Sequence, residues 1–275
     1  MNVEALLVLA VAMLATGAVG GVLAGLLGVG GGIVIVPVLD FALSLLGVDP
    51  AIRMHVAVGT SLATIVPTSI SSARAHHAKG SVDFEIARFW GPLVLVGAVL
   101  GGLSAAWVSG RWLAAVFGVV ALIVALKMIL VSDQKTLTRG VPRGVAGAPL
   151  PIVIGGLSSW MGIGGGTLSV PSLTLMSQPV HRAVGTSALL GLAIALPAMV
   201  LFIVTGWSDD RTPQFSLGYV NLIGLVLIAP VTVLTAPLGA KLAHRLSQRQ
   251  LSLAFGGFLL LVAARMLVNA WRGGV

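Results

Sequence analysis

Long apolar runs, separated by short breaks of glycine, proline and charged residues, make up most of the chain. A helix needs about 20 apolar residues to cross a bilayer, so each long run predicts one membrane segment. Two runs, 33–47 and 167–177, are shorter and are expected either to cross or to form hairpins with the preceding run, which gives about 8–10 membrane segments. The predicted segments are 5–27, 33–47, 54–73, 87–108, 112–132, 149–161, 167–177, 183–206, 216–240 and 250–271.

Three sequence motifs occur twice, in the same order. The stretch 28–37, GVGGGIVIVP, matches 162–171, GIGGGTLSVP, at six of ten positions. The stretch 55–61, HVAVGTS, matches 181–187, HRAVGTS, at six of seven positions, and 117–128 matches 255–266 at six of twelve. Three matched pairs in register indicate a tandem duplication. We therefore predict a first membrane repeat at 1–132, a cytoplasmic linker at 133–148 and a second membrane repeat at 149–275.

Because each half contains an odd number of segments, the second half is expected to lie inverted relative to the first. Loop charges agree, since cytoplasmic loops of membrane proteins collect Lys and Arg. With the N-terminus outside, the inside loops 74–86, 133–148, 178–182 and 241–249 hold nine basic residues and the outside stretches hold four. The predicted fold is an all-α polytopic membrane protein of two inverted homologous halves with glycine-interrupted helices, a common plan of secondary transporters.

Composition narrows the function classes further. Hydrophobic residues make up 57% of the chain and charged residues 9%, with a mean hydropathy of +1.06. Soluble domains carry about a quarter charged residues, so a soluble globule and a nucleic-acid binder are excluded. The net charge of +8 fits basic cytoplasmic loops. The chain has no cysteine, which excludes disulfides and thiolate metal sites, and neither a metal nor a cofactor is expected.

The two glycine-rich motifs are the first candidate binding elements. Glycine allows left-handed backbone and close approach to a ligand. Successive N–H groups in such a turn bind anions, and the helix that follows adds the positive end of its dipole. Close helix packing is the alternative explanation for small residues in membranes. We expect two anion-binding turns to meet near the midplane, formed by Gly30, Gly31, Gly32, Gly164, Gly165 and Gly166.

The duplicated Gly-Thr-Ser element supplies candidate hydroxyl ligands. Thr60, Ser61, Thr186 and Ser187 are expected to contact the anion, although hydroxyls near a helix start also serve as caps. The first copy continues with Thr64, Thr68 and Ser72 on one helical face. Such a stripe either joins helices or lines a polar path.

Ionisable residues inside the segments are few. Buried ionisable groups usually carry proton relays in membranes. Any proton coupling is therefore expected to use His55, His181 or Asp40, or protonation of the substrate itself.

The doubled GxGGGxxxxP and HxAVGTS motifs resemble those of the sulfite exporter TauE/SafE family, from about Ala24 to Met266. The resemblance implies a transporter of small anions, especially sulfite or organosulfonates, in the cell membrane, which would be the inner membrane in a Gram-negative source. Its expected partners are a small anion and the lipid bilayer, with no nucleic acid; the sequence leaves the oligomeric state open. The alternatives are an anion channel, a transporter of another carboxylate or oxyanion, and an intramembrane hydrolase using Ser61 or Ser187.

Overall fold

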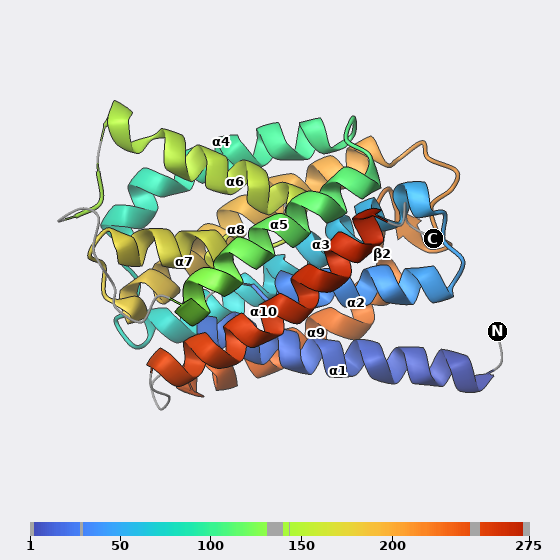
Figure 1. Ribbon diagram of the computed structural model, residues 1–275, viewed down its shortest axis with the longest axis horizontal. Coiled ribbons are helices and arrows are strands. Elements are labelled where there is room, and N and C mark those ends of the chain that lie inside the picture. Colours follow the sequence, from blue (N-terminus) through green and yellow to red (C-terminus); the bar gives the residue numbers. More distant parts are fainter. Residues whose placement is uncertain (1–2, 28–29, 131–139, 143, 243–247, 272–275) are drawn as a thin grey trace.

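The computed structural model describes residues 3–27, 30–130, 140–142, 144–242 and 248–271 (Figure 1). Within these residues the chain forms ten α-helices, one short 3₁₀ helix and one two-stranded hairpin, which confirms the predicted all-α membrane fold. The first half holds α1 (Val3–Leu27), α2 (Gly32–Leu45), α3 (Pro50–His77), α4 (Phe84–Ala105) and α5 (Gly110–Leu130). The remainder is η1 (Val145–Gly147), α6 (Pro149–Met161), α7 (Gly166–Leu175), α8 (Val180–Thr205), β1 (Ser216–Leu217), β2 (Val220–Asn221), α9 (Leu222–Leu242) and α10 (Gln248–Trp271).

The helices follow the predicted segments closely. Among the described residues, α3, α4, α5, α8 and α9 are long and apolar enough to cross a membrane. The start of the predicted segment 216–240 is the exception, because residues 216–221 form the β1–β2 hairpin instead of helix. Gly218 has a positive φ of 53°, and the Asn221 side chain accepts a hydrogen bond from the Gly224 N–H, so the helix begins only at Leu222.

Equivalent helices of the two halves run in opposite directions. Gly59 near the start of α3 lies against Phe202 near the end of α8, and Gly185 near the start of α8 lies against His76 near the end of α3. In the same way, α5 and α10 pair antiparallel, with Gly118 against Leu267 (Figure 1). The second half is therefore inverted relative to the first, as predicted.

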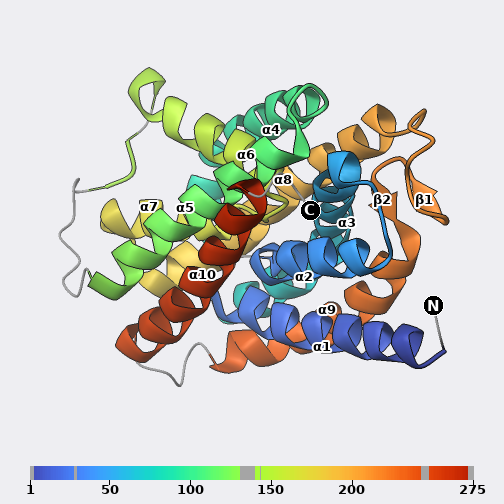
Figure 2. The ribbon, with the colours of Figure 1, turned by 45° about the vertical axis from the view of Figure 1, so that its right-hand side comes forward.

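The halves also exchange helices. α1 packs along α9 of the second half, and its equivalent α6 packs along α4 of the first half. A Cβ on Gly17 would lie 2.9 Å from the carbonyl oxygen of Ile228, and one on Gly101 would lie 2.6 Å from that of Gly156. These close backbone contacts explain many of the scattered glycines as packing residues. The short helix α2 lies inside this frame, packed against α3 and flanked by α1 and α10 (Figure 2).

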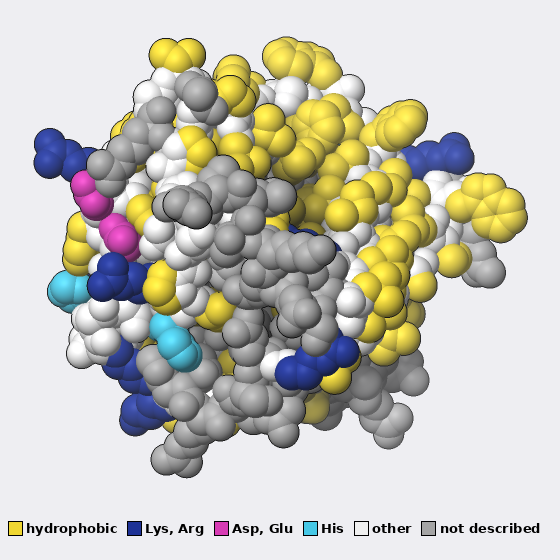
Figure 3. All heavy atoms as spheres, turned by 60° about the vertical axis from the view of Figure 1, so that its left-hand side comes forward, with side chains coloured by type: hydrophobic (Ala, Val, Ile, Leu, Met, Phe, Trp, Pro, Cys, Tyr) yellow, Lys and Arg dark blue, Asp and Glu magenta, His cyan; other side chains and the backbone are white. Residues whose placement is uncertain are grey.

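The two ends of the bundle differ in chemistry. One end, which we call the tryptophan end, carries Trp107, Trp112, Trp207 and Trp271, each at least 67% exposed. Exposed tryptophans mark membrane interfaces. The opposite end, which we call the basic end, exposes Arg74, Lys79, Arg88, Arg182, Lys241 and Arg249. Figure 3 shows Lys and Arg side chains on this side and apolar side chains covering the flank. The basic end corresponds to the predicted cytoplasmic loops, apart from the linker 133–148, half of which lies outside the described residues.

The sidedness can be tested with single cysteines in this cysteine-free chain. Ala78→Cys at the basic end and Asp210→Cys at the tryptophan end are both at exposed positions. In intact cells, an impermeant maleimide should label Asp210→Cys only, and Ala78→Cys should react only after the membrane is opened. Labelling of both positions from the same side would contradict the inverted arrangement.

Candidate substrate site

Each half contains one glycine turn that leads into a half-length helix. Gly31 precedes α2 with a φ of 78°, and Gly165 precedes α7 with a φ of 73°. Side chains other than glycine are strained in this left-handed conformation. The duplicated motif therefore encodes the same backbone break twice.

The structure brings the two glycine turns into contact. A Cβ on Gly30 would lie 3.3 Å from the Cα of Gly164. The Ser61 hydroxyl donates a hydrogen bond of 2.7 Å to the carbonyl oxygen of Gly162. Because Ile65 of α3 touches Gly30 and Ile194 of α8 touches Gly165, the turns meet about halfway along these two long helices.

Unpartnered hydrogen-bond donors lie at the second turn and on the helices α3, α6, α7 and α8. In the described part of the chain, no acceptor contacts the backbone N–H groups of residues 164–167. Several buried hydroxyls on α3, α6, α7 and α8 also have no partner in the structure, and each is at most 2% exposed. They are Ser69, Ser158, Ser159, Thr167, Ser169 and Ser187. Buried polar groups are nearly always hydrogen-bonded, so this cluster indicates a place where a ligand binds.

The two turns are not equivalent in polarity. Residues Ala24, Gly25, Ile33 and Ile35 of the first repeat correspond to Ser158, Ser159, Thr167 and Ser169 of the second. In the described residues the backbone N–H groups of residues 30–33 have no acceptor either, so the two turns differ in their side chains: those at the first turn are apolar, whereas those at the second carry hydroxyls. These four residues are not among the site residues predicted from the duplicated motifs, although the difference is visible when the two copies of the motif are aligned.

The Gly-Thr-Ser hydroxyls divide into two roles. Ser61 donates to the carbonyl oxygen of Gly162 at the second turn, and the Ser187 hydroxyl is buried without a partner in the structure. Thr60, in contrast, accepts a 2.8 Å hydrogen bond from the N–H of Asn221. Thr186 accepts a 2.9 Å bond from the N–H of Asp83 in the same way. Both threonines therefore join the two halves.

The hydroxyl stripe of α3 also joins helices. Thr68 bonds to Thr232 of α9 at 2.6 Å, and Ser72 donates to the carbonyl oxygen of Ala24 in α1 at 3.4 Å. Thr64 bonds within α3 to the carbonyl oxygen of Ser61. Of the two explanations for the stripe, these contacts support the joining of helices.

The candidate coupling residues lie away from the turns. His55 places Nε2 beside the carbonyl oxygens of Ala105 and Val108, at 3.2 and 3.0 Å, at the tryptophan end. His181 is exposed in the first turn of α8. Asp40 forms a buried 3.0 Å ion pair with Arg53 and accepts a bond from Asn269.

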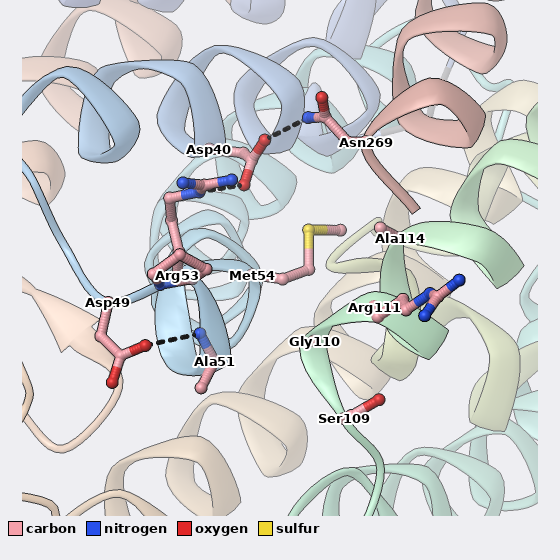
Figure 4. Close-up of a pocket in the computed structure, with 11 residues that line it drawn as sticks. Asp40, Asp49, Ala51, Arg53, Met54, Ser109, Gly110, Arg111, Ala114 and Asn269 are labelled. Carbon is pink, nitrogen blue, oxygen red and sulfur yellow. Dashed lines mark hydrogen bonds and ion pairs between the residues drawn. The ribbon is translucent and has the colours of Figure 1, made fainter. Parts of the chain in front are cut away.

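The Asp40–Arg53 ion pair lines a cavity of about 390 Å³ at the tryptophan end, together with Arg111 and Ser109 (Figure 4). The carboxylate of Asp40 is held between α3 and α10 by its two partners. Among the described residues, His, Asp and Glu form no group of three or more that could hold a metal ion.

Inverted halves with paired helix breaks that meet inside the bundle are the features of a secondary transporter. The model of the sulfite exporter TauE/SafE family matches residues 13–266, and the chain belongs to this family.

Relatives from bacteria and archaea agree with this assignment. A Haemophilus influenzae protein named "Probable membrane transporter protein" is 36% identical over 262 residues, covering 93% of this chain and 97% of its own length. The Bacillus subtilis "Probable membrane transporter protein YunE" is 25% identical over 280 residues, covering 94% and 97%. A Methanocaldococcus jannaschii protein with the same description is 25% identical over 93% of this chain and 94% of its own. No solved structure matches the chain. The protein is therefore a multi-pass membrane transporter and not an enzyme.

A polar network covers the tryptophan end between α8 and α9. Asp209 accepts hydrogen bonds of 2.8 Å from Arg211 and 2.9 Å from the Tyr219 hydroxyl. Hydrogen bonds from Arg211 lower the pKa of Asp209 to about 2. Burial, followed by the bond to Asp209, raises the pKa of Tyr219 to about 12. Both groups therefore keep their charge states throughout the physiological pH range.

Tyr219 is the only tyrosine of the chain, so an ultraviolet titration of tyrosinate reports this residue alone. The wild-type titration should have its midpoint near pH 12. Asp209→Asn should lower the midpoint, because the neighbouring negative charge is lost, but the midpoint should stay above the ordinary value of about 10 because burial remains. Equal midpoints in both proteins would contradict this geometry.

Proposed function

We propose that the protein is a secondary transporter of small anions, with sulfite or an organosulfonate as substrate, bound where the two glycine turns meet. The observation that carries the proposal is the cluster of unpartnered donors at residues 164–167 and on the neighbouring serines and threonine. An oxyanion has several acceptor oxygens, and each could take one of these bonds.

The chemistry of the cluster favours an anion over a cation. Backbone N–H groups can only donate, and the start of α7 adds the positive end of a helix dipole. Cation sites instead use carboxylate and carbonyl oxygens, whereas the carboxylate of Asp40 is already paired with Arg53. A site without a fixed charge also suits a transporter, because the anion has to leave again.

The other candidate functions have less support. A channel needs a continuous path, whereas the two turns are packed so closely that a Cβ on Gly30 would lie 3.3 Å from the Cα of Gly164. For a hydrolase, a histidine would have to bond to Ser61 or Ser187. Ser61 donates to Gly162, and His55 Nε2 faces two backbone carbonyl oxygens.

We propose that the anion moves by alternating access between the inverted halves. Proton coupling through His55, His181 or Asp40 stays part of this proposal, as does protonation of the substrate itself. All three residues lie away from the turns, and this supports coupling through protonation of the substrate. We place the N-terminus outside and the basic end in the cytoplasm, in line with the positive-inside rule.

Binding measurements on purified variants test the site. A hydrogen bond to a charged group contributes about 1.5–3 kcal/mol, so Ser187→Ala and Ser169→Ala should each weaken sulfite binding by roughly ten- to a hundredfold. Gly165→Val should weaken it more, because its side chain would overlap Ile194 and strain the left-handed turn.

Ser172→Ala is the matched control, since Ser172 lies on the same helix as Ser169 but donates to the carbonyl oxygen of Leu168. The affinity of this variant should equal that of the wild type. Equal affinity for radiolabelled sulfite and for a sulfonate in all the variants would place the site elsewhere.

A further inference from the structure

The loop between α8 and α9 closes over α3 at the tryptophan end. Its carbonyl oxygen at Tyr219 approaches Gly59 so closely that a Cβ on Gly59 would lie only 2.5 Å away. Thr60, the next residue of the Gly-Thr pair, accepts a hydrogen bond from the N–H of Asn221. We call the contacts of Gly59 and Thr60 with residues 219–221 the first latch.

The loop between α3 and α4 closes over α8 at the basic end in the same way. The carbonyl oxygen of Ser81 lies directly against Gly185, where a Cβ would overlap it. Thr186 accepts a hydrogen bond from the N–H of Asp83. We call the contacts of Gly185 and Thr186 with residues 81–83 the second latch.

The two latches correspond in detail. In each, the threonine of one half bonds to the residue just before a helix of the other half, α9 or α4. That residue also caps its helix: Asp83 accepts from the N–H groups of Glu85 and Ile86, and Asn221 accepts from that of Gly224. Each latch therefore fixes one half to the other at one end of the bundle.

Both latches lie within about two helical turns of the glycine turns. Gly59 is six residues before Ile65, which touches Gly30, and Gly185 is six residues before Gly191, which touches Gly164. At a rise of 1.5 Å per residue, each latch lies about 9 Å from the turns along its helix. Val220, 2% exposed, shows how deeply the first loop is inserted.

We propose that these latches are the two gates of the transporter, and that the duplicated Gly-Thr pair serves gating while, in the second copy, Ser187 faces the substrate. The proposal rests on the proposed function, because it describes how the site between the turns opens to each side. The first latch controls access from the tryptophan end, and the second controls access from the basic end. In the structure both are closed. Each contains one side-chain hydrogen bond and one glycine contact. Further contacts lie beside them: the rings of His55 and Tyr219 pack together and Arg211 pairs with Asp49 at the first latch, and Arg182 pairs with Asp83 at the second.

A cysteine reporter at the turns tests the gates without any substrate. Ser69→Cys places a thiol at the buried position that faces Gly191 and the Gly164 turn. In sealed, oriented vesicles, an impermeant thiol reagent is added from one side at a time. Adding Thr60→Val, which removes the acceptor but keeps the shape, should raise the labelling rate from the tryptophan end by roughly tenfold, the factor for about 1.4 kcal/mol. Thr186→Val should do the same from the basic end.

Second variants separate gating from general loosening. Gly59→Ala should raise labelling from the tryptophan end as Thr60→Val does, because its methyl group would push the Tyr219 carbonyl away. Thr60→Ser keeps the hydroxyl and should label at the wild-type rate. Gly91→Ala, where a Cβ would meet no atom within 4 Å, is the matched glycine control.

Rates that rise equally from both sides, or that do not change, would overturn the gating proposal. One-sided changes in a protein that transports no anion would support the gates and overturn the proposed function. Normal sulfite transport together with unchanged labelling would support the proposed function and overturn the gates.

Discussion

The backbone of a membrane protein cannot leave its polar groups unpaired in hydrocarbon, and this constraint governs the centre of the molecule. Non-helical backbone survives at that depth only where protein surrounds it or where it lines a cavity. The chain is interrupted before α2 and before α7. The first interruption lies against α1, α3 and the second turn, and the second lies against α3, α8 and the first turn. Ser61 pairs the Gly162 carbonyl oxygen, while the N–H groups of residues 164–167 stay unpaired. The donors left over at the second turn are the basis of the proposed site.

Duplication and inversion give the fold its symmetry. Substitutions within the repeats then give the two halves different roles at the proposed site. Both halves keep the glycine turn, the threonine that joins the halves and the serine that follows this threonine. Only the second half has Thr167 and Ser169, where the first has Ile33 and Ile35. In this account the first turn packs against the site, and the second turn binds the anion. One asymmetric site between symmetric gates suits a transporter that presents the same binding groups to both sides of the membrane.

Much of this fold follows from the sequence, because long apolar runs in a membrane have few alternatives to helix. The segments, the duplication and the inversion could be predicted, and so could the meeting of the two glycine turns. The prediction missed the hairpin at 216–221, because Leu217, Tyr219 and Val220 extend the apolar run of α9, and the turn residues Gly218 and Asn221 separate them from the helix. The roles of Thr60 and Thr186 depend on which loop of the other half reaches them. Local sequence patterns carry no information on such a long-range contact.

The central claim is that the anion binds at the second glycine turn, and a structure with a heavier analogue of sulfite tests it most directly. Selenite has the shape and charge of sulfite and an anomalous X-ray signal that locates it independently of the protein density. The account predicts an anomalous peak within hydrogen-bond distance of the N–H groups of residues 164–167 and of the Ser187 hydroxyl. A peak confined to the cavity lined by Arg53 and Arg111, with none at the turns, would contradict it.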